Sequence, residues 1–144
     1  MTVRKGNGNI IKTYNKGDHN KFLNELGVYL LAKQKKLDFI PELLDYNVSK
    51  RTLKIKNVGE SMEDLYKGDM KKKCSYRKRI MEMYKKLVKE GLYHNDLRYK
   101  NVIHNRKTDK LYLIDFEFTS KKLEDKDDDK IINPVKCRDV FRFE

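Results

Sequence analysis

The most informative part of this sequence is HNDLRYKN at residues 94–101, followed by LYLIDFE at residues 111–117. A tight loop between a long helix and a hairpin can present Asp96 and Asn101 toward one point. Asp115, at the end of the returning strand, reaches the same point. Converging carboxylate and amide oxygens suit Mg²⁺, which proteins commonly hold by one or two carboxylates together with substrate phosphates. The pattern therefore predicts a magnesium site that serves the transfer of a phosphoryl group.

The residues upstream predict a small antiparallel sheet with one helix. β-forming residues flank Gly6-Asn7-Gly8, which is typical of a tight turn between two strands within Thr2–Tyr14. Apolar residues at three-to-four-residue spacing predict a helix over His19–Lys36, with Asp18 as its N-cap. Two further strands are expected, at Leu43–Val48 and Thr52–Val58.

The residues that follow predict mainly helical structure. Met62–Tyr66 is expected to form a single helical turn, and Met70–Glu90 one long helix whose outer face is strongly basic. The predicted apolar stripe of the long helix consists of Cys74, Ile80, Met81, Tyr84, Leu87 and Val88. Two short strands are then expected at Val102-Ile103 and Leu111–Phe116.

Length and charge limit the class of protein. The chain has 144 residues, which allow one domain or two small lobes. No stretch approaches the roughly 18 consecutive apolar residues that span a bilayer, and the first residues lack the apolar region of a signal peptide. We therefore expect an intracellular, cytoplasmic protein with no membrane partner. The net charge of +12 should attract nucleic acid non-specifically, but no nucleic-acid-binding motif is present, so no specific nucleic-acid partner is expected.

The two quoted segments resemble the catalytic motifs of the protein-kinase-like superfamily. The first matches its catalytic loop, H-x-D-L-x-x-x-N, and the second matches its metal motif, D-F-G, with Glu117 in place of the glycine. The matching residues are His94, Asp96, Leu97, Asn101, Asp115 and Phe116. The resemblance covers roughly residues 1–118 and implies a kinase that uses ATP and Mg²⁺.

The resemblance also implies roles for individual residues. Asp96 would accept or orient the proton of the attacking hydroxyl, and Arg98 would stabilise charge on the oxygens of the transferred phosphoryl group. Asn101 and Asp115 would hold Mg²⁺. His94 would pack and form hydrogen bonds in the loop rather than act as an acid–base catalyst.

Upstream residues resemble the nucleotide-binding half of the same family. Lys12 corresponds to the strand lysine that positions the α- and β-phosphates, and Glu25 corresponds to its ion-pair partner. Gly6 and Gly8 would cover the phosphates as a glycine-rich loop, with a plain hairpin turn as the alternative. The adenine would face the backbone of Asn57, Val58 and Gly59.

The implied fold is α+β and has the two lobes of a kinase. Residues 1–58 would form an N-lobe with a small antiparallel sheet and one helix. Residues 59–144 would form a truncated, mainly helical C-lobe with the catalytic loop and the metal motif. GESMEDL, at residues 59–65, resembles the hinge region of casein-kinase-like and poxvirus-type protein kinases. We therefore expect a virus-type kinase that acts inside an infected host cell.

The class of acceptor stays open at this point. We expect transfer to Ser or Thr hydroxyls of a protein, which the basic surface and the hinge favour, and the other classes are alternatives. Glu117 and the HNDL string resemble choline- and aminoglycoside-type kinases, which favours a small hydroxyl-bearing substrate. Asn95 replaces the arginine that pairs with a phosphorylated activation loop in many regulated protein kinases, so activation by that route is not expected. A third interpretation is a pseudokinase or docking module that binds nucleotide without transferring phosphate.

The C-lobe is shorter than the resemblance requires. Only 26 residues follow Phe118, too few for the family's helical subdomain, and Cys137–Phe141 resembles the start of its central buried helix. The chain is either a fragment or a natural miniature. We expect the apolar surface left by the missing part to be covered by a second copy, as a homodimer, or by a partner protein.

Overall fold

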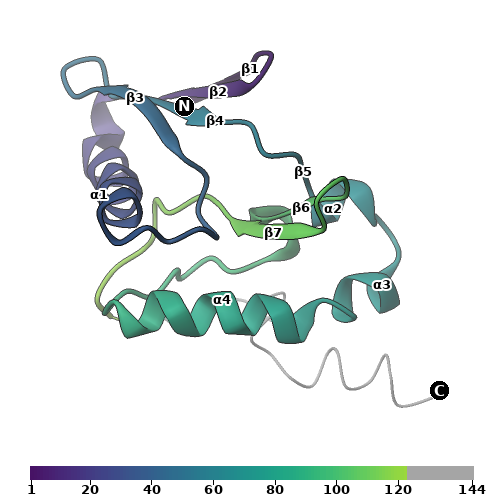
Figure 1. The fold of residues 1–144 in the computed structure, drawn as a ribbon. Coiled ribbons are helices and arrows are strands. Elements are labelled where there is room, and N and C mark those ends of the chain that lie inside the picture. Colours follow the sequence, from purple (N-terminus) through teal and green to yellow (C-terminus); the bar gives the residue numbers. More distant parts are fainter. Residues whose placement is uncertain (123–144) are drawn as a thin grey trace.

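A four-stranded antiparallel sheet, here called the first sheet, begins the computed structural model, which describes residues 1–122 (Figure 1). Its strands are β1 (Thr2–Lys5), β2 (Asn9–Thr13), β3 (Leu43–Asn47) and β4 (Thr52–Lys56), in the order β1-β2-β4-β3. Both predicted hairpins are present. In the first of them, Gly8 takes a φ of 80°, a left-handed value that glycine adopts without strain.

One helix, α1 (His19–Lys35), packs against the first sheet, as predicted (Figure 1). Its buried residues include Phe22, Leu26 and Tyr29. Asp18 precedes the helix, but its side chain does not form the predicted N-cap hydrogen bond. The reason is a short 3₁₀ helix, η1 (Lys16–Asp18), which gives Asp18 a φ of −108° and a ψ of 24°. An N-cap residue needs a more extended backbone to turn its side chain back onto the helix.

The predicted long helix over Met70–Glu90 is wrong in one respect, because it is broken into α3 (Met70–Cys74) and α4 (Arg77–Lys89). The Ser75 hydroxyl donates to the Lys72 carbonyl at 2.5 Å, and Tyr76 N donates to Lys73 O at 3.1 Å. Bonds to the third residue back, rather than the fourth, tighten the chain and bend a helix. The buried stripe also differs from the prediction within α4, where Met83 packs in the core with Ile80 and Leu87 at three- and four-residue spacing while Met81 is only half-buried.

A second sheet, of three strands, forms below the first. It contains β5 (Glu60–Ser61), β6 (Val102–Asn105) and β7 (Lys110–Leu113), in the order β5-β6-β7. The last two are the predicted strands, whereas β5 was not foreseen because two residues are too few to show alternation. A short helix, α2 (Met62–Leu65), follows β5, and the 3₁₀ helix η2 (Tyr99–Asn101) precedes β6.

One hydrophobic core extends through both halves of the described chain. It includes Tyr29 of α1, Leu53 of the first sheet, Leu87 of α4 and Leu113 of β7. The two halves also share a backbone hydrogen bond, in which Leu113 N donates to Phe39 O at 2.8 Å. The fold is therefore the predicted α+β class with a kinase-like arrangement, and the division into lobes at residue 58 stays a prediction.

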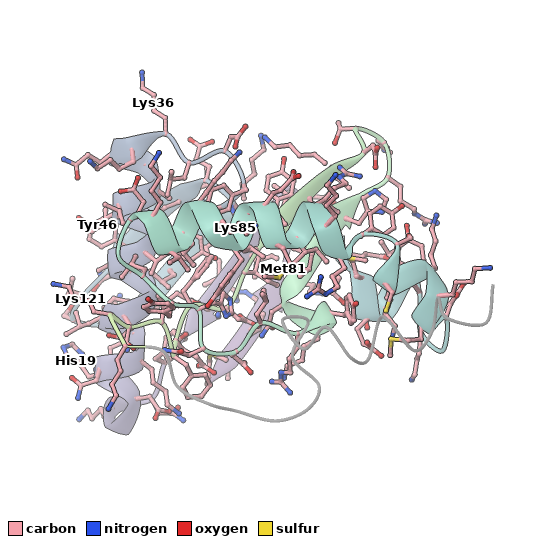
Figure 2. All side chains as sticks on the ribbon, turned by 90° about the horizontal axis from the view of Figure 1, so that it is seen from below. His19, Lys36, Tyr46, Met81, Lys85 and Lys121 are labelled. Atoms are coloured by element: carbon pink, nitrogen blue, oxygen red, sulfur yellow. The ribbon has the colours of Figure 1, made fainter. Side chains whose placement is uncertain are left out.

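Exposed lysines and exposed hydrophobic residues both occur on the surface of the described residues. Seen from below, α4 crosses the molecule with Lys85 on its outer face, and other exposed lysines share this helix (Figure 2). The exposed large hydrophobic residues of the described chain are Met1, Val3, Leu23, Leu30, Leu44, Tyr46 and Val48. All of them lie in or beside the first sheet and α1, not among residues 59–122, where a covering partner was expected. That partner, whether a second copy or another protein, stays a prediction.

Two further observations bear on the predictions. Among residues 1–122, every helix is too short or too polar to cross a bilayer. The predicted start of a central helix at Cys137–Phe141 lies outside the described residues.

Candidate active site

A buried ion pair joins β2 to α1 at the centre of the molecule. Lys12 Nζ lies 2.5 Å from Glu25 Oε1 and 2.8 Å from Asp115 Oδ1. The side chains of Lys12 and Glu25 are 6% and 0% exposed, whereas that of Asp115 is 38% exposed. The structure therefore brings together the predicted strand lysine, its helix glutamate and the acid of the metal motif, from segments about a hundred residues apart in sequence.

Glu25 is fixed on both of its oxygens. Its Oε2 accepts from Phe116 N at 2.7 Å, and its Oε1 also accepts from the Tyr14 hydroxyl at 3.0 Å. Burial raises the pKa of Glu25, and Lys12 opposes that shift. For Lys12, burial lowers the pKa, but the charges of Glu25 and Asp115 outweigh it and leave the pKa raised. Lys12 is therefore held as a cation that faces the metal motif.

The catalytic loop forms a second cluster around Asp96. Asn101 Nδ2 donates to Asp96 O at 2.8 Å and to Asp96 Oδ2 at 3.1 Å. Arg98 Nε lies 2.9 Å from Asp96 Oδ1, and Arg98 Nη2 donates to Oδ2 at 3.2 Å. The Asp96 side chain is 15% exposed, so it reaches solvent while its neighbours hold its orientation.

His94 and Asn101 join the two clusters through Ile114, the residue before Asp115. Ile114 N donates to Asn101 O at 3.0 Å, and His94 Nε2 lies 2.8 Å from Ile114 O. His94 Nδ1 accepts from Asp96 N at 3.2 Å. Burial lowers the pKa of His94, which keeps its ring neutral near pH 7. These contacts confirm the expectation that His94 packs and forms hydrogen bonds in the loop.

The residues predicted to hold Mg²⁺ fit that ion. Asn101 is fully buried, and within residues 1–122 its Oδ1 has no hydrogen-bond partner. A buried amide oxygen without a partner costs free energy unless a ligand satisfies it. The described residues contain no group of three or more His, Cys, Asp and Glu side chains that could hold a metal alone. One amide and one carboxylate, Asp115, match a Mg²⁺ ion that also binds phosphate oxygens.

A cavity of about 310 Å³ opens beside Lys12 and Asp115. Its apolar walls include Val3, Ile10, Ile55, Ile103 and Ile114, which come from both sheets and from the strand end before Asp115. A flat apolar group fits between such walls, and phosphates would lie toward the Lys12 end. Sequence reasoning did not place these residues in the site, although Ile10 and Ile55 could have been found because each lies two residues from Lys12 or its strand partner Leu53, and therefore on the same face of the sheet.

Polar residues at the start of α2 also line this cavity. Ser61, Glu63 and Asp64 do so, together with Lys100 of the catalytic loop. The Ser61 hydroxyl accepts from Asp64 N at 3.1 Å and so caps α2. An N-cap serine was the signal in the sequence that could have placed these residues at a helix start.

The residues of the predicted hinge and glycine-rich loop do not all lie at the Lys12 cavity. Gly59 lines the Lys12 cavity, whereas Gly8, Asn57 and Val58 line a separate hollow of about 400 Å³ that Gly59 also borders. Asn57 N donates to Gly8 O at 3.0 Å, and Val58 O accepts from the Asn105 side chain at 3.0 Å.

Gly6 N donates to Asn9 O at 2.9 Å, as in a plain hairpin turn. Neither Gly6 nor Gly8 is among the residues that line the Lys12 cavity. The nucleotide contacts of Gly6, Gly8, Asn57 and Val58 therefore stay predictions without support from their placement.

Comparisons with known proteins agree with this geometry. Residues 18–127 match the family model described as choline/ethanolamine kinase. Among solved structures, the kinase PK-1 of the Cydia pomonella granulovirus is similar, with a TM-score of 0.63 and 19% sequence identity. The similarity covers 82% of this chain and 47% of that kinase, so the chain spans about half of its length. No curated protein matches the sequence. The predicted resemblance to the protein-kinase-like superfamily is confirmed.

Proposed function

This chain belongs to the choline/ethanolamine kinase family, and on that premise we propose that it transfers the γ-phosphate of ATP to a hydroxyl group. The observation that carries the proposal is the meeting of Lys12, Glu25 and Asp115 beside a cavity, next to the Asp96 cluster. Phosphoryl transfer depends on positioning and on charge stabilisation, and both groups of residues supply these.

Lys12 is the residue proposed to position the nucleotide phosphates. Its ammonium group is held by Glu25, which is fully buried and hydrogen-bonded on both oxygens. Its other contact, Asp115, is partly exposed at the cavity. Phosphate oxygens can therefore share Lys12 with Asp115 while the pair with Glu25 stays intact.

Asn101 and Asp115 are proposed to hold Mg²⁺, whose chemistry in this reaction is to neutralise charge on the phosphate oxygens. Asn101 contributes the buried oxygen that lacks a partner within the described chain. The Ile114 backbone keeps Asn101 beside Asp115. Lys12 carries a further positive charge against the same carboxylate.

Asp96 is proposed to accept or orient the proton of the attacking hydroxyl. Asn101 and Arg98 fix its carboxylate, and its partial exposure leaves it open to an acceptor. A positioned carboxylate contributes to catalysis only when it lies within hydrogen-bond reach of the acceptor hydroxyl. Arg98 is proposed to move between Asp96 and the transferred phosphoryl group, where its charge would stabilise the oxygens.

Two classes of acceptor follow from different observations. The family match favours a small amino alcohol, as does Glu117 after the metal motif. The strongly basic chain supports the alternative, a protein Ser or Thr hydroxyl. We propose the small amino alcohol first, because the family match rests on sequence whereas the structural likeness at 19% identity concerns the fold.

The test is transfer of labelled γ-phosphate from ATP in the presence of Mg²⁺. Choline, ethanolamine, and basic and acidic proteins serve as acceptors. We expect labelling of one acceptor class by the wild-type chain, and a loss of at least about 100-fold in Asp96→Ala and Asp115→Asn, because each removes a group that acts in the reaction. Asp38→Asn is the matched control, since the Asp38 side chain is 75% exposed and its Oδ2 lies 3.8 Å from Lys110 Nζ, a long surface ion pair.

The outcomes separate the alternatives. Labelling of a protein rather than an amino alcohol would move the assignment to a protein kinase. Nucleotide binding that requires Mg²⁺, without any transfer, would indicate a pseudokinase. A wild-type chain that neither binds the nucleotide nor transfers phosphate would contradict the proposed function of this site.

A further inference from the structure

Asn95 is a buried amide in the catalytic loop that the proposed chemistry does not use. It is 3% exposed and has a φ of 65°, in the left-handed region that asparagine tolerates better than most residues. Its neighbours in sequence, His94 and Asp96, point toward Ile114 and Arg98. The left-handed backbone at Asn95 directs its own side chain to a different segment.

That segment is the stretch immediately after the metal motif. Asn95 Nδ2 donates to Phe118 O, to Ser120 Oγ and to Lys122 O, each at 3.0 Å. An amide nitrogen carries two hydrogens, so at least one of them is shared between two acceptors. One neutral side chain thus contacts every second residue of an irregular segment, at Phe118, Ser120 and Lys122.

The backbone around Asn95 binds the same segment. Tyr93 N donates to Ser120 O at 2.8 Å, and Ser120 N donates to Tyr93 O at 3.1 Å. Thr119 Oγ1 donates to His94 O at 3.4 Å. Residues 93–95 therefore contact residues 118–122 through both main chain and side chains.

The segment connects directly to the proposed metal ligand. Thr119 N donates to Phe116 O at 3.1 Å, and Phe116 N is held by Glu25. Only two residues separate Asp115 from Phe118. A displacement of residues 118–122 would therefore shift the chain that carries Asp115 relative to Asp96.

We infer that Asn95 is a positioning residue that fixes Phe118–Lys122 against the catalytic loop and so keeps Asp115 in place relative to Asp96. The inference rests on the proposed function for its effect on the reaction. All three acceptors are uncharged, and a neutral amide satisfies them without any added phosphate.

The experiment compares two substitutions that act differently on the backbone. Asn95→Asp keeps the shape but replaces both N–H donors with an oxygen that faces three acceptors. Asn95→Gly removes the side chain but retains the left-handed backbone at no steric cost. Asn47→Asp is the matched control, because Asn47 uses its Oδ1 to accept from Ser49 and Lys50, and aspartate keeps that acceptor.

Amide hydrogen exchange and steady-state kinetics are the two measurements. In both Asn95 variants, we expect exchange of residues 118–122 to rise about tenfold, the effect of losing a hydrogen bond to a buried group, while exchange in α4 stays unchanged. We expect kcat to fall about tenfold with a change in the KM for ATP of less than about twofold, since Lys12 and the cavity are untouched. The Asn47→Asp variant should match the wild type in amide exchange, in kcat and in the KM for ATP.

Each contrary result has a distinct meaning. Unchanged exchange in residues 118–122 would overturn the inference, and so would raised exchange with an unchanged kcat. Increased exchange in α4 of Asn95→Asp would indicate general unfolding, in which case Asn95→Gly decides. A wild-type chain that transfers no phosphate would refute the proposed function alone, and exchange of residues 118–122 would still support or overturn their attachment to Asn95.

Discussion

At the scale of single residues, the site depends on charges that are buried only because they are paired. Lys12 and Glu25 are almost inaccessible to solvent, and each would be costly to bury alone. Asp115, the second ion-pair partner of Lys12, differs from Glu25 because its side chain remains partly exposed. Glu25 is therefore the structural partner of Lys12, and Asp115 is the one whose contact a bound nucleotide can replace.

His94 leads to a prediction on pH. Its ring is neutral when Nε2–H donates to Ile114 O and Nδ1 accepts from Asp96 N. Burial lowers the pKa of His94 in the folded state, so the unfolded chain binds more protons as the pH falls through 6.5. The free energy of unfolding should therefore decrease from pH 7 toward pH 5, as measured by urea unfolding at each pH.

His94→Gln is the variant that isolates this effect. Glutamine can keep a donor toward Ile114 O but has no titrating group in this range. We expect the variant to be less stable than the wild type at pH 7 and to depend less on pH between 7 and 5. An equally steep pH dependence in both chains would show that other groups cause it.

At the scale of elements, the sequence predicts the strands and helices whose apolar residues recur at a clear spacing or that begin at a clear capping residue. The strands β2 and β4 and the helix α1 follow from alternation and from helical spacing. The break between α3 and α4 could not be predicted, because it depends on one serine hydroxyl that bonds to the Lys72 carbonyl within an otherwise helical pattern. β5 likewise exists only through its pairing with β6.

In the candidate site, too, residues that belong to local sequence patterns could be predicted, whereas tertiary contacts could not. Lys12, Glu25, Asp96, Asn101 and Asp115 follow from motifs, because those motifs place chemically distinctive residues at fixed intervals. The bonds made by the Asn95 amide and by the Asn105 side chain join segments far apart in the sequence. Such bonds depend on tertiary structure and leave no local pattern.

Gly59, in the predicted hinge after β4, leads to the prediction at the scale of elements. Gly59 has a φ of 131°, and a Cβ there would lie 3.4 Å from Ile103 Cγ2 and 3.5 Å from Asn105 Cα. Gly59→Ala should lower the free energy of unfolding by about 1–3 kcal/mol, because a side chain is strained at this φ. Thermal unfolding measures this change.

Gly27→Ala is the matched control for the hinge variant. Gly27 lies within α1, has no positive φ, and a Cβ there meets nothing within 4 Å. The same substitution should therefore raise the free energy of unfolding by about 0.5–1 kcal/mol, through helix propensity. A Gly59→Ala chain as stable as Gly27→Ala would contradict the strain assigned to the hinge.

At the scale of the whole molecule, the two sheets meet at the site. Lys12 contacts Asp115, Glu25 contacts Phe116 N, and the rings of Tyr29 and Phe116 lie 5.5 Å apart at 85°. These contacts come from β2 and α1 on one side and from the metal motif on the other. Binding of a ligand between them should therefore stabilise the fold as a unit.

This linkage can be measured by thermal unfolding with ATP and Mg²⁺ together and with each alone. At a free ligand concentration one hundred times the dissociation constant, the bound state should gain about 2.7 kcal/mol. The full shift should require both components, because Lys12 is proposed to contact the phosphates while Asn101 and Asp115 are proposed to hold the metal. The Asp115→Asn variant should lose most of the Mg²⁺-dependent increase in stability. It should still be stabilised by ATP alone, because the neutral amide no longer pairs with Lys12 by charge and Lys12 can bind phosphate. Equal shifts in the two chains would mean that Asp115 does not hold the metal, and the ligand would then stabilise the molecule through the cavity walls alone.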